Sequence, residues 1–281
     1  MIGVKKFKSS LSWHIAIQGE FSDFFSSPFF QIMHFEIFNK GQTSKKNKKI
    51  NALHFVVKTH ARNNRWRSIS TLKDGNIRYS VGISRNKKLL FLQMIRLSQS
   101  IAICSGSHGA ILLHAALAAS KHKGVLLCGP SGSGKTTSSK RLPPPWRSLS
   151  DDATLLVQDN LGRYWAYPWP TWSRFPRCRK KGSWPLLNPV RLSAICFLKK
   201  TPADEISTAS PRESIIQLMA SSEQAVHFVS YRMPRMVQTK HRMDRFNLCC
   251  DLVKAIPCFH LGVSLSGKFW EKIEQKIASL E

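Results

Sequence analysis

The residues with the clearest capacity for chemistry form a glycine-rich segment near the middle of the chain. Residues 129–136 read Gly-Pro-Ser-Gly-Ser-Gly-Lys-Thr, which matches at every fixed position the pattern Gly, four variable residues, Gly-Lys and then Ser or Thr. Glycines let the backbone curl until successive N–H groups point at one anion, and the start of the following helix adds positive charge. The apolar run at 125–128 supplies the preceding strand. The segment therefore predicts a loop that binds the phosphates of a nucleotide.

The positions of this loop have separate predicted roles. We expect Lys135 to reach the terminal phosphates of ATP and the Thr136 hydroxyl to ligate Mg²⁺. Pro143 should end the following helix near residue 142, because proline has no N–H to donate. The helix would then span barely two turns, which excludes the long helix of small GTPases. The other expected nucleotide-binding residues are Gly129, Ser131, Gly132, Ser133, Gly134 and Thr137.

Two adjacent carboxylates follow the loop. Asp151 and Asp152 stand 16 and 17 residues beyond Lys135, just before a strand expected at 154–157. Such a pair can divide two tasks, since one carboxylate can hold a metal while the other accepts a proton from an attacking hydroxyl. The acidic residue of a common phosphate-loop protein sits at the end of an apolar strand, whereas this pair precedes one. Spacing alone leaves a solvated turn equally open.

An aromatic segment and a basic run lie further along the chain. Residues 164–172 read Tyr-Trp-Ala-Tyr-Pro-Trp-Pro-Thr-Trp, and five basic residues follow within 174–181. Interleaved rings and cations can stack on a base or hold an extended acidic peptide. The alternative is that the rings cap the hydrophobic core. We expect Arg174 to contact a phosphate.

Periodicity and turn residues outline the elements that position these groups. Alternating apolar and β-branched residues predict strands at 13–18, 31–38, 53–59 and 77–83, so the first hundred residues are expected to be β-rich. A helix is predicted at 91–104, and 110–119 could be a helix or a strand. Later elements are a strand at 192–198, a helix at 211–220 and a final amphipathic helix from 268 onward.

The charge balance restricts the partners. The 281-residue chain carries 43 Lys and Arg against 16 Asp and Glu, a formal net charge of +27 that is spread over both halves. Hydrophobic residues make up 42%, so an ordinary folded core is expected rather than disorder. A surface this basic attracts anions. No helix-turn-helix, RNP or zinc-finger pattern is present, so acidic partners are favoured over nucleic acid.

Compartment is predicted from features that the sequence lacks. Seven cysteines without paired metal-ligand spacings predict reduced thiols, and the first residues do not form a signal peptide. Residues 97–120 carry no charge, but their serines and histidines are too polar for a membrane span, so a buried helix followed by a buried strand is expected. We predict a cytoplasmic protein without a membrane span and leave homo-oligomerisation open.

Three segments together resemble a known family. Leu113-His114-Ala115, the loop with its preceding strand at 124–136, and Leu149-Ser150-Asp151-Asp152 resemble the catalytic core of HPr serine kinase/phosphorylase. They are more similar still to the HPr kinase-like proteins found beside peptide-modifying gene clusters, such as the SynChlorMet cassette protein ScmC group and the lasso-peptide tailoring kinases. The similarity covers about residues 105–175, with looser matches at 166–170 and 269–271.

The resemblance implies both a fold and site roles. The fold would be α/β (α+β), a mixed, curved sheet with short helices related to phosphoenolpyruvate carboxykinase, with 110–119 a strand and 121–124 a hairpin turn. A β-rich region of unknown role (1–104) would precede this phosphate-loop domain (105–281). By similarity Asp151 is the general base, Asp152 supports the metal, and His114 lies close to the phosphoryl-transfer site. ATP and Mg²⁺ are the implied cofactors.

One departure from the family limits what can be carried over. HPr kinases have an acidic-Arg-Gly signature downstream of the carboxylate pair, whereas residues 169–175 here contain no carboxylate. HPr as a substrate and reverse phosphorolysis are therefore poorly supported. We expect an ATP-dependent kinase acting on a hydroxyl or carboxylate of a peptide or small acceptor, with nearby maturation enzymes as candidate partners. The alternatives are a non-catalytic ATP-binding accessory protein and, last, a basic nucleic-acid-binding module.

Overall fold

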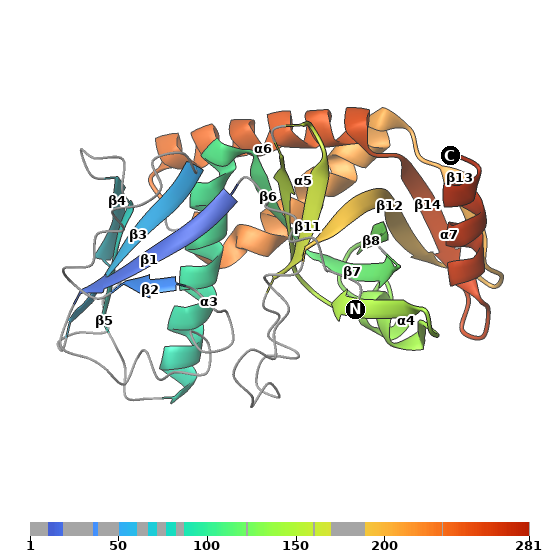
Figure 1. Cartoon of the computed structure of the whole chain (residues 1–281), viewed down its shortest axis with the longest axis horizontal. Helices are drawn as coiled ribbons and strands as arrows, with labels where there is room; N and C mark the ends of the chain where they lie inside the picture. Colours follow the sequence, from blue (N-terminus) through green and yellow to red (C-terminus); the bar gives the residue numbers. More distant parts are fainter. Residues whose placement is uncertain are drawn as a thin grey trace, which may run out of the picture.

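Two β-sheets and five α-helices make up the part of the chain that the computed structural model describes (Figure 1). The described residues are 11–18, 36–38, 51–60, 67–71, 77–82, 87–121, 123–159, 161–169, 189–231 and 233–280. Among them, no strand of one sheet pairs with a strand of the other.

The smaller sheet is formed by the N-terminal strands, in the order β2-β1-β3-β5-β4. β1, β2, β3 and β5 pair in parallel, and β4 pairs with β5 in antiparallel fashion. The strands expected at 13–18, 53–59 and 77–83 correspond to β1, β3 and β5, whereas most of the one expected at 31–38 lies outside the described residues. The bounds are β1 (Leu11–Gln18), β2 (Glu36–Phe38), β3 (Asn51–His60), β4 (Arg67–Thr71) and β5 (Ile77–Gly82).

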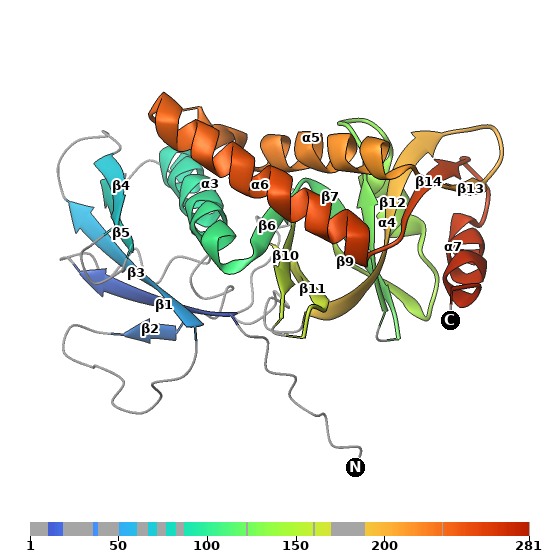
Figure 2. The same cartoon turned by 90° about the horizontal axis from the view of Figure 1, so that it is seen from above.

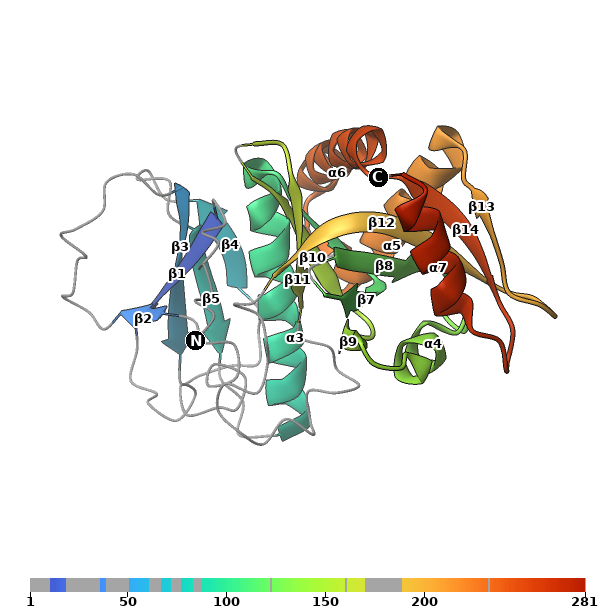
Figure 3. The same ribbon diagram turned by 45° about the vertical axis from the view of Figure 1, so that its right-hand side comes forward.

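A long helix leads from the first sheet to the second. Helix α3 (Lys87–Cys104) begins four residues before the predicted start and continues into the short 3-10 helix η1 (Ser105–His108). Figure 3 shows α3 between the two sheets. No helix in the described ranges is long and apolar enough to cross a membrane.

The larger sheet has nine strands and carries the glycine-rich loop. Its main order is β6-β10-β11-β12-β8-β7-β9, and β14 pairs with β12 and β13. β12 runs parallel to β8 and β14, and the remaining pairs are antiparallel, so the predicted mixed sheet is confirmed. The bounds are β6 (Ala110–Leu113), β7 (Ala115–Ser120), β8 (Lys123–Cys128), β9 (Trp146–Ser150), β10 (Thr154–Gln158), β11 (Tyr164–Pro168), β12 (Val190–Lys200), β13 (Glu205–Thr208) and β14 (Cys258–Val263).

The region expected to be one strand at 110–119 is two strands separated by His114. The break arises because the two halves take different partners: β6 pairs with β10, whereas β7 pairs with β8 and β9. β7 and β8 form a hairpin in which Ser120 pairs with Lys123, so its turn is tighter than the predicted 121–124.

Helices cover both faces of the larger sheet, and a cluster of buried apolar residues lies between each face and its helices. α5 (Pro211–Ser230) and α6 (Arg235–Ala255) lie side by side on one face (Figure 2), where Leu218 and Leu252 are fully buried. α7 (Phe269–Ala278) packs Phe269 and Ile273 on the other face. Because both faces are covered, β8 is an uninterrupted buried run, as its sequence predicted.

Helix lengths differ from the sequence-based expectation. α4 (Lys135–Arg141) ends before Pro143 as predicted, but α5 continues ten residues past the predicted residue 220, and α6 was not predicted. The start of α5 is fixed by a capping box between Ser210 and Glu213, with Pro211 at the first helical position. Among the described residues, the implied short helices are therefore represented by α4 and α7.

Candidate functional site

The glycine-rich loop (residues 129–136) begins at the end of β8, beside the parallel strand β12. It leaves β8 directly after Cys128, which pairs with Phe197 of β12. Gly132 and Gly134 have φ angles of 81° and 101°, values that residues with a side chain rarely adopt. A Cβ added at Gly129 would lie 2.6 Å from the Ser133 Oγ atom. Three of the glycines are thus required by the conformation of the loop.

Lys135 turns back into the loop that precedes it. Its Nζ atom donates hydrogen bonds to the carbonyl oxygens of Gly129 at 2.7 Å and Pro130 at 3.0 Å. Only 6% of the residue is exposed, and burial lowers the pKa of the Lys135 ammonium, while nearby Asp152 acts in the opposite direction. The positive charge is therefore held within the loop instead of extending into solvent.

Asp152 and His114 form a contact next to this lysine. The Asp152 Oδ1 atom lies 3.1 Å from the His114 Nδ1 atom, and the two side chains are 37% and 17% exposed. Burial lowers the pKa of His114; Asp152 opposes this effect, and Lys135 reinforces it. The net direction favours a neutral imidazole near pH 7.

The two neighbouring aspartates occupy different environments. Asp151 is 2% exposed, so its carboxylate lies within the protein, whereas Asp152 is open to solvent on one side. The turn around them is fixed by a 2.9 Å contact between the hydroxyls of Ser150 and Thr154. Thr154 also donates to the carbonyl oxygen of Ala115 at the start of β7. This anchors the carboxylate pair close to the strand that follows His114.

The structure brings together some of the sequence-predicted site residues and separates others. Lys135, Asp152 and His114 are close to one another, and Asp151 faces the interior. Arg174 and the basic run around it lie outside the described residues. Among the predicted nucleotide-binding residues, the solvent-exposed ones are Ser131, Gly132, Thr136 and Thr137.

The aromatic segment belongs to the core. Tyr164, Trp165 and Tyr167 lie in β11 and are at most 8% exposed, and Trp169, just after the strand, is 1% exposed. Of the two interpretations that the sequence left open, rings that stack on a base do not fit these four residues. Trp172 lies outside the described residues.

Comparison with known proteins identifies a family. The sequence profile of the SynChlorMet cassette protein ScmC family matches residues 80–278. The chain belongs to this family. No curated protein matches the chain.

The family match includes every residue discussed as a candidate site. It begins within β5 and ends with α7, so it contains α3, the whole larger sheet and the glycine-rich loop. Strands β1 to β4 lie outside it, in the region for which the sequence offered no resemblance. The division of the chain at 104/105 stays a prediction.

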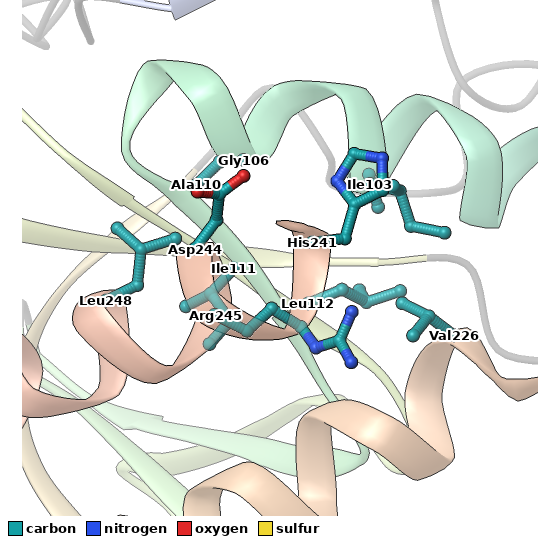
Figure 4. A pocket seen from close by; sticks show the side chains of 11 residues that line it. Ile103, Gly106, Ala110, Ile111, Leu112, Val226, His241, Asp244, Arg245 and Leu248 are labelled. Atoms are coloured by element: carbon teal, nitrogen blue, oxygen red, sulfur yellow. The ribbon is translucent and has the colours of Figure 1, made fainter. Parts of the chain in front are cut away.

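Two hollows in the described surface lie away from these residues. A cavity of about 20 Å³ between β6 and α6 has room for one water and is lined by His241, Asp244 and Arg245 (Figure 4). A groove of about 290 Å³ lies between the start of α5, the end of α6 and α7. Neither is lined by a sequence-predicted site residue.

The structure also shows a residue beside the candidate site that the sequence did not predict. Ser221 of α5 contacts the backbone of His114, although it precedes another serine inside an ordinary helix. Nothing in its sequence context distinguishes it from Ser222. Only the packing of α5 against the break between β6 and β7 could identify it.

Proposed function

We propose that this chain is an ATP-dependent phosphotransferase of the HPr kinase-like type. It would move the terminal phosphoryl group of ATP to a hydroxyl or carboxylate of a peptide or small acceptor. The observation that carries the proposal is the meeting of three side chains: Lys135 inside the glycine-rich loop, and the Asp152–His114 pair beside it. A cation for the phosphates and an accessible carboxylate for the acceptor are what phosphoryl transfer requires.

The geometry of the loop supports nucleotide binding. It follows the end of β8, which pairs in parallel with β12, and uses glycines where positive φ angles or close contacts require them. The Ser133 hydroxyl is buried without a hydrogen-bond partner in the described part of the chain, which fits a loop built to receive a polar ligand. The two carbonyl contacts of Lys135 show that its ammonium can be placed within the loop before ATP arrives.

The difference in burial between the two carboxylates supports a choice of the proton acceptor. Sequence similarity assigned the general base to Asp151, but Asp151 is 2% exposed, and an acceptor oxygen cannot reach it without movement of the turn. We assign the proton-accepting role to Asp152, which is accessible and oriented by His114. In the transfer step Asp152 takes the hydroxyl proton, the acceptor oxygen bonds to the γ-phosphorus, and the bond to the β-phosphate oxygen breaks to release ADP.

The residues beside the loop fit a magnesium ion in their chemistry. The Thr136 hydroxyl is a hard oxygen donor on an exposed residue, and it is the expected protein ligand that remains once Asp152 is assigned to the proton. Within the described ranges, no group of three or more His, Cys, Asp or Glu residues is placed to hold a metal ion. Mg²⁺ commonly uses one or two protein ligands together with substrate phosphates and water, and it would neutralise charge on those phosphates.

The family and the net charge support an acidic partner as the acceptor. The family is named for a cassette protein, so partners encoded alongside it are the natural candidates for substrate or complex. A net charge of +27 favours an acidic partner, and an acidic precursor peptide meets both conditions. The non-catalytic alternative, an ATP-binding accessory protein, would keep the loop and its lysine but would not need Asp152.

The test is transfer of labelled phosphate by the purified full chain. We would incubate it with Mg²⁺, ATP labelled at the γ-phosphate and synthetic acidic peptides that contain serine and threonine, and detect products by mass spectrometry. Asp152→Asn should lower the transfer rate by about 10²- to 10⁴-fold, the usual contribution of a general base. Asp151→Asn is the matched control and should retain transfer.

Two results would count against this assignment. Loss of transfer in Asp151→Asn but not in Asp152→Asn would return the base to Asp151. Binding of Mg·ATP with no labelled product from any peptide would refute transfer to peptide hydroxyls and favour the accessory protein.

A further inference from the structure

The break between β6 and β7 leaves the backbone of His114 outside the ladders of the sheet. Leu113 pairs with Thr154 and Ala115 pairs with Cys128, but His114 itself has no partner among the described strand pairs. Buried backbone polar groups must find other partners, because leaving one unpaired costs about 1–3 kcal/mol. Helix α5 provides those partners.

One residue of α5 satisfies both polar groups of the His114 backbone. The N–H of His114 donates to the carbonyl oxygen of Ser221 at 3.2 Å, and the Ser221 hydroxyl donates to the carbonyl oxygen of His114 at 3.2 Å. We propose that Ser221 is a positioning residue, which holds His114 so that its imidazole meets Asp152 at the phosphoryl-transfer site. The inference rests on the proposed function for its catalytic meaning, but the geometric part can be tested without it.

A reciprocal pair of bonds restrains more than a single bond would. Fixing the N–H and the C=O of the same residue fixes its two peptide planes and therefore the direction of its Cα–Cβ bond. The imidazole can then swing only about its own side-chain torsions. Since Ser221 is 6% exposed, water cannot readily replace its hydroxyl.

The helix that carries Ser221 is itself firmly held. Its first turn is closed by the Ser210–Glu213 capping box, and Leu218 and Ser222 on either side of Ser221 are fully buried against the sheet. Ser221 is thus presented by a fixed element. Loss of its hydroxyl removes one of the two bonds and leaves the backbone bond, so it should loosen His114 without unfolding α5.

The neighbouring serine offers a matched control. Ser222 is fully buried, and its hydroxyl has no hydrogen-bond partner among the residues that the structure describes. Ser222→Ala therefore removes the same atoms from the same helix, one position away, without touching His114. Ser221→Thr keeps a hydroxyl and serves as the rescue variant.

The direct readout is the placement of the His114 ring, followed at one fixed pH by NMR of the imidazole Cε1–H signals of the full chain. The His114 signal is assigned by its loss in His114→Gln. In Ser221→Ala we expect this signal to shift and broaden, because loss of the hydroxyl bond lets the ring sample more than one orientation beside Asp152. Ser222→Ala and Ser221→Thr should keep the wild-type chemical shift and line width.

Activity gives a second, separate readout. Loss of one neutral hydrogen bond, about 0.5–1.5 kcal/mol, predicts a fall in kcat of about two- to thirteenfold for Ser221→Ala with an unchanged KM for ATP. An unaltered His114 signal in Ser221→Ala, or an equal change in Ser222→Ala, would overturn the positioning role. If the wild type transfers no phosphate, the NMR comparison still decides whether Ser221 holds His114, and only the proposed function fails.

Discussion

Gly129→Ala adds a methyl group at a point where the glycine-rich loop has no space for one. The new Cβ would lie 2.6 Å from Ser133 Oγ, 3.0 Å from Ser133 Cβ and 3.4 Å from the carbonyl oxygen of Leu198. The first two distances are shorter than ordinary van der Waals contacts. The carbonyl oxygen of Leu198 prevents the new methyl group from moving toward β12. Ser133 must therefore move, which opens the loop.

The size of the effect follows from the cost of overpacking. Inserting a methylene-sized group into a packed site costs about 1–3 kcal/mol. Without ATP the loop can relieve the clash by opening. Binding of ATP requires the closed loop, so most of this free-energy cost lowers the binding affinity. At 1.36 kcal/mol for each factor of ten, the affinity for Mg·ATP should fall by about 5- to 150-fold.

Isothermal titration calorimetry with Mg·ATP measures the change, and thermal unfolding confirms that the variant is folded. Gly106→Ala is the matched control, because no atom lies within 4 Å of its added Cβ and the residue is far from the loop in sequence. Its affinity should equal that of the wild type. If folded Gly129→Ala binds Mg·ATP within twofold of the wild type, the loop does not hold phosphate in the conformation described.

Two further predictions concern stability. Burial alone would raise the pKa of Asp159, but hydrogen bonds from Trp165 and from residues of the turn outweigh it and hold the pKa at about 2. The Asp159 carboxylate therefore stabilises the fold above pH 3.8, and this stabilisation is lost as pH falls toward 2. Asp159→Asn should lower the free energy of unfolding at pH 7, measured by urea denaturation, by about 1–2 kcal/mol. An equal loss at pH 2 would contradict this. Trp146→Phe removes the 2.6 Å hydrogen bond from the indole to Glu274, which links β9 to α7, and should cost about 0.5–1.5 kcal/mol. The double variant with Glu274→Gln should show less than the sum of the two single effects, and full additivity would argue against the bond.

Local signals predicted the part of the fold around the loop. The apolar run before Gly129 became β8, and Pro143 ended α4 where the missing N–H requires it. These features depend on neighbours in the sequence, so the sequence alone is sufficient to predict them. The strand at 154–157 was predicted for the same reason and is β10.

Elements defined by distant partners were missed. β9 reads Trp-Arg-Ser-Leu-Ser, without an apolar run, and is a strand because it pairs with β7. Helix α6 carries many exposed polar and basic residues, and its fully buried positions are Cys249 and Leu252, so its periodicity is weak. For the aromatic residues of β11 the sequence left both a ligand platform and the core open, and pairing with β10 places them in the core.

The candidate site, like the fold, was predicted from the sequence only where local spacing was sufficient. Spacing identified Asp151 and Asp152 together, and nothing in the sequence separates their environments. The fold separates them, since one carboxylate is buried and the other contacts His114. The break at His114 and its support from Ser221 depend on how β6, β7 and α5 pack, which no local pattern encodes.

The central claim is that Lys135 and its loop bind a nucleoside triphosphate. The most direct measurement is the affinity of the full chain for Mg·ATP by calorimetry, compared with Lys135→Met, which keeps the apolar part of the side chain. We predict saturable 1:1 binding that weakens at least tenfold in the folded variant, a loss of about 1.4 kcal/mol or more. No binding by the wild type at millimolar Mg·ATP, or equal affinities for the two proteins, would contradict the claim.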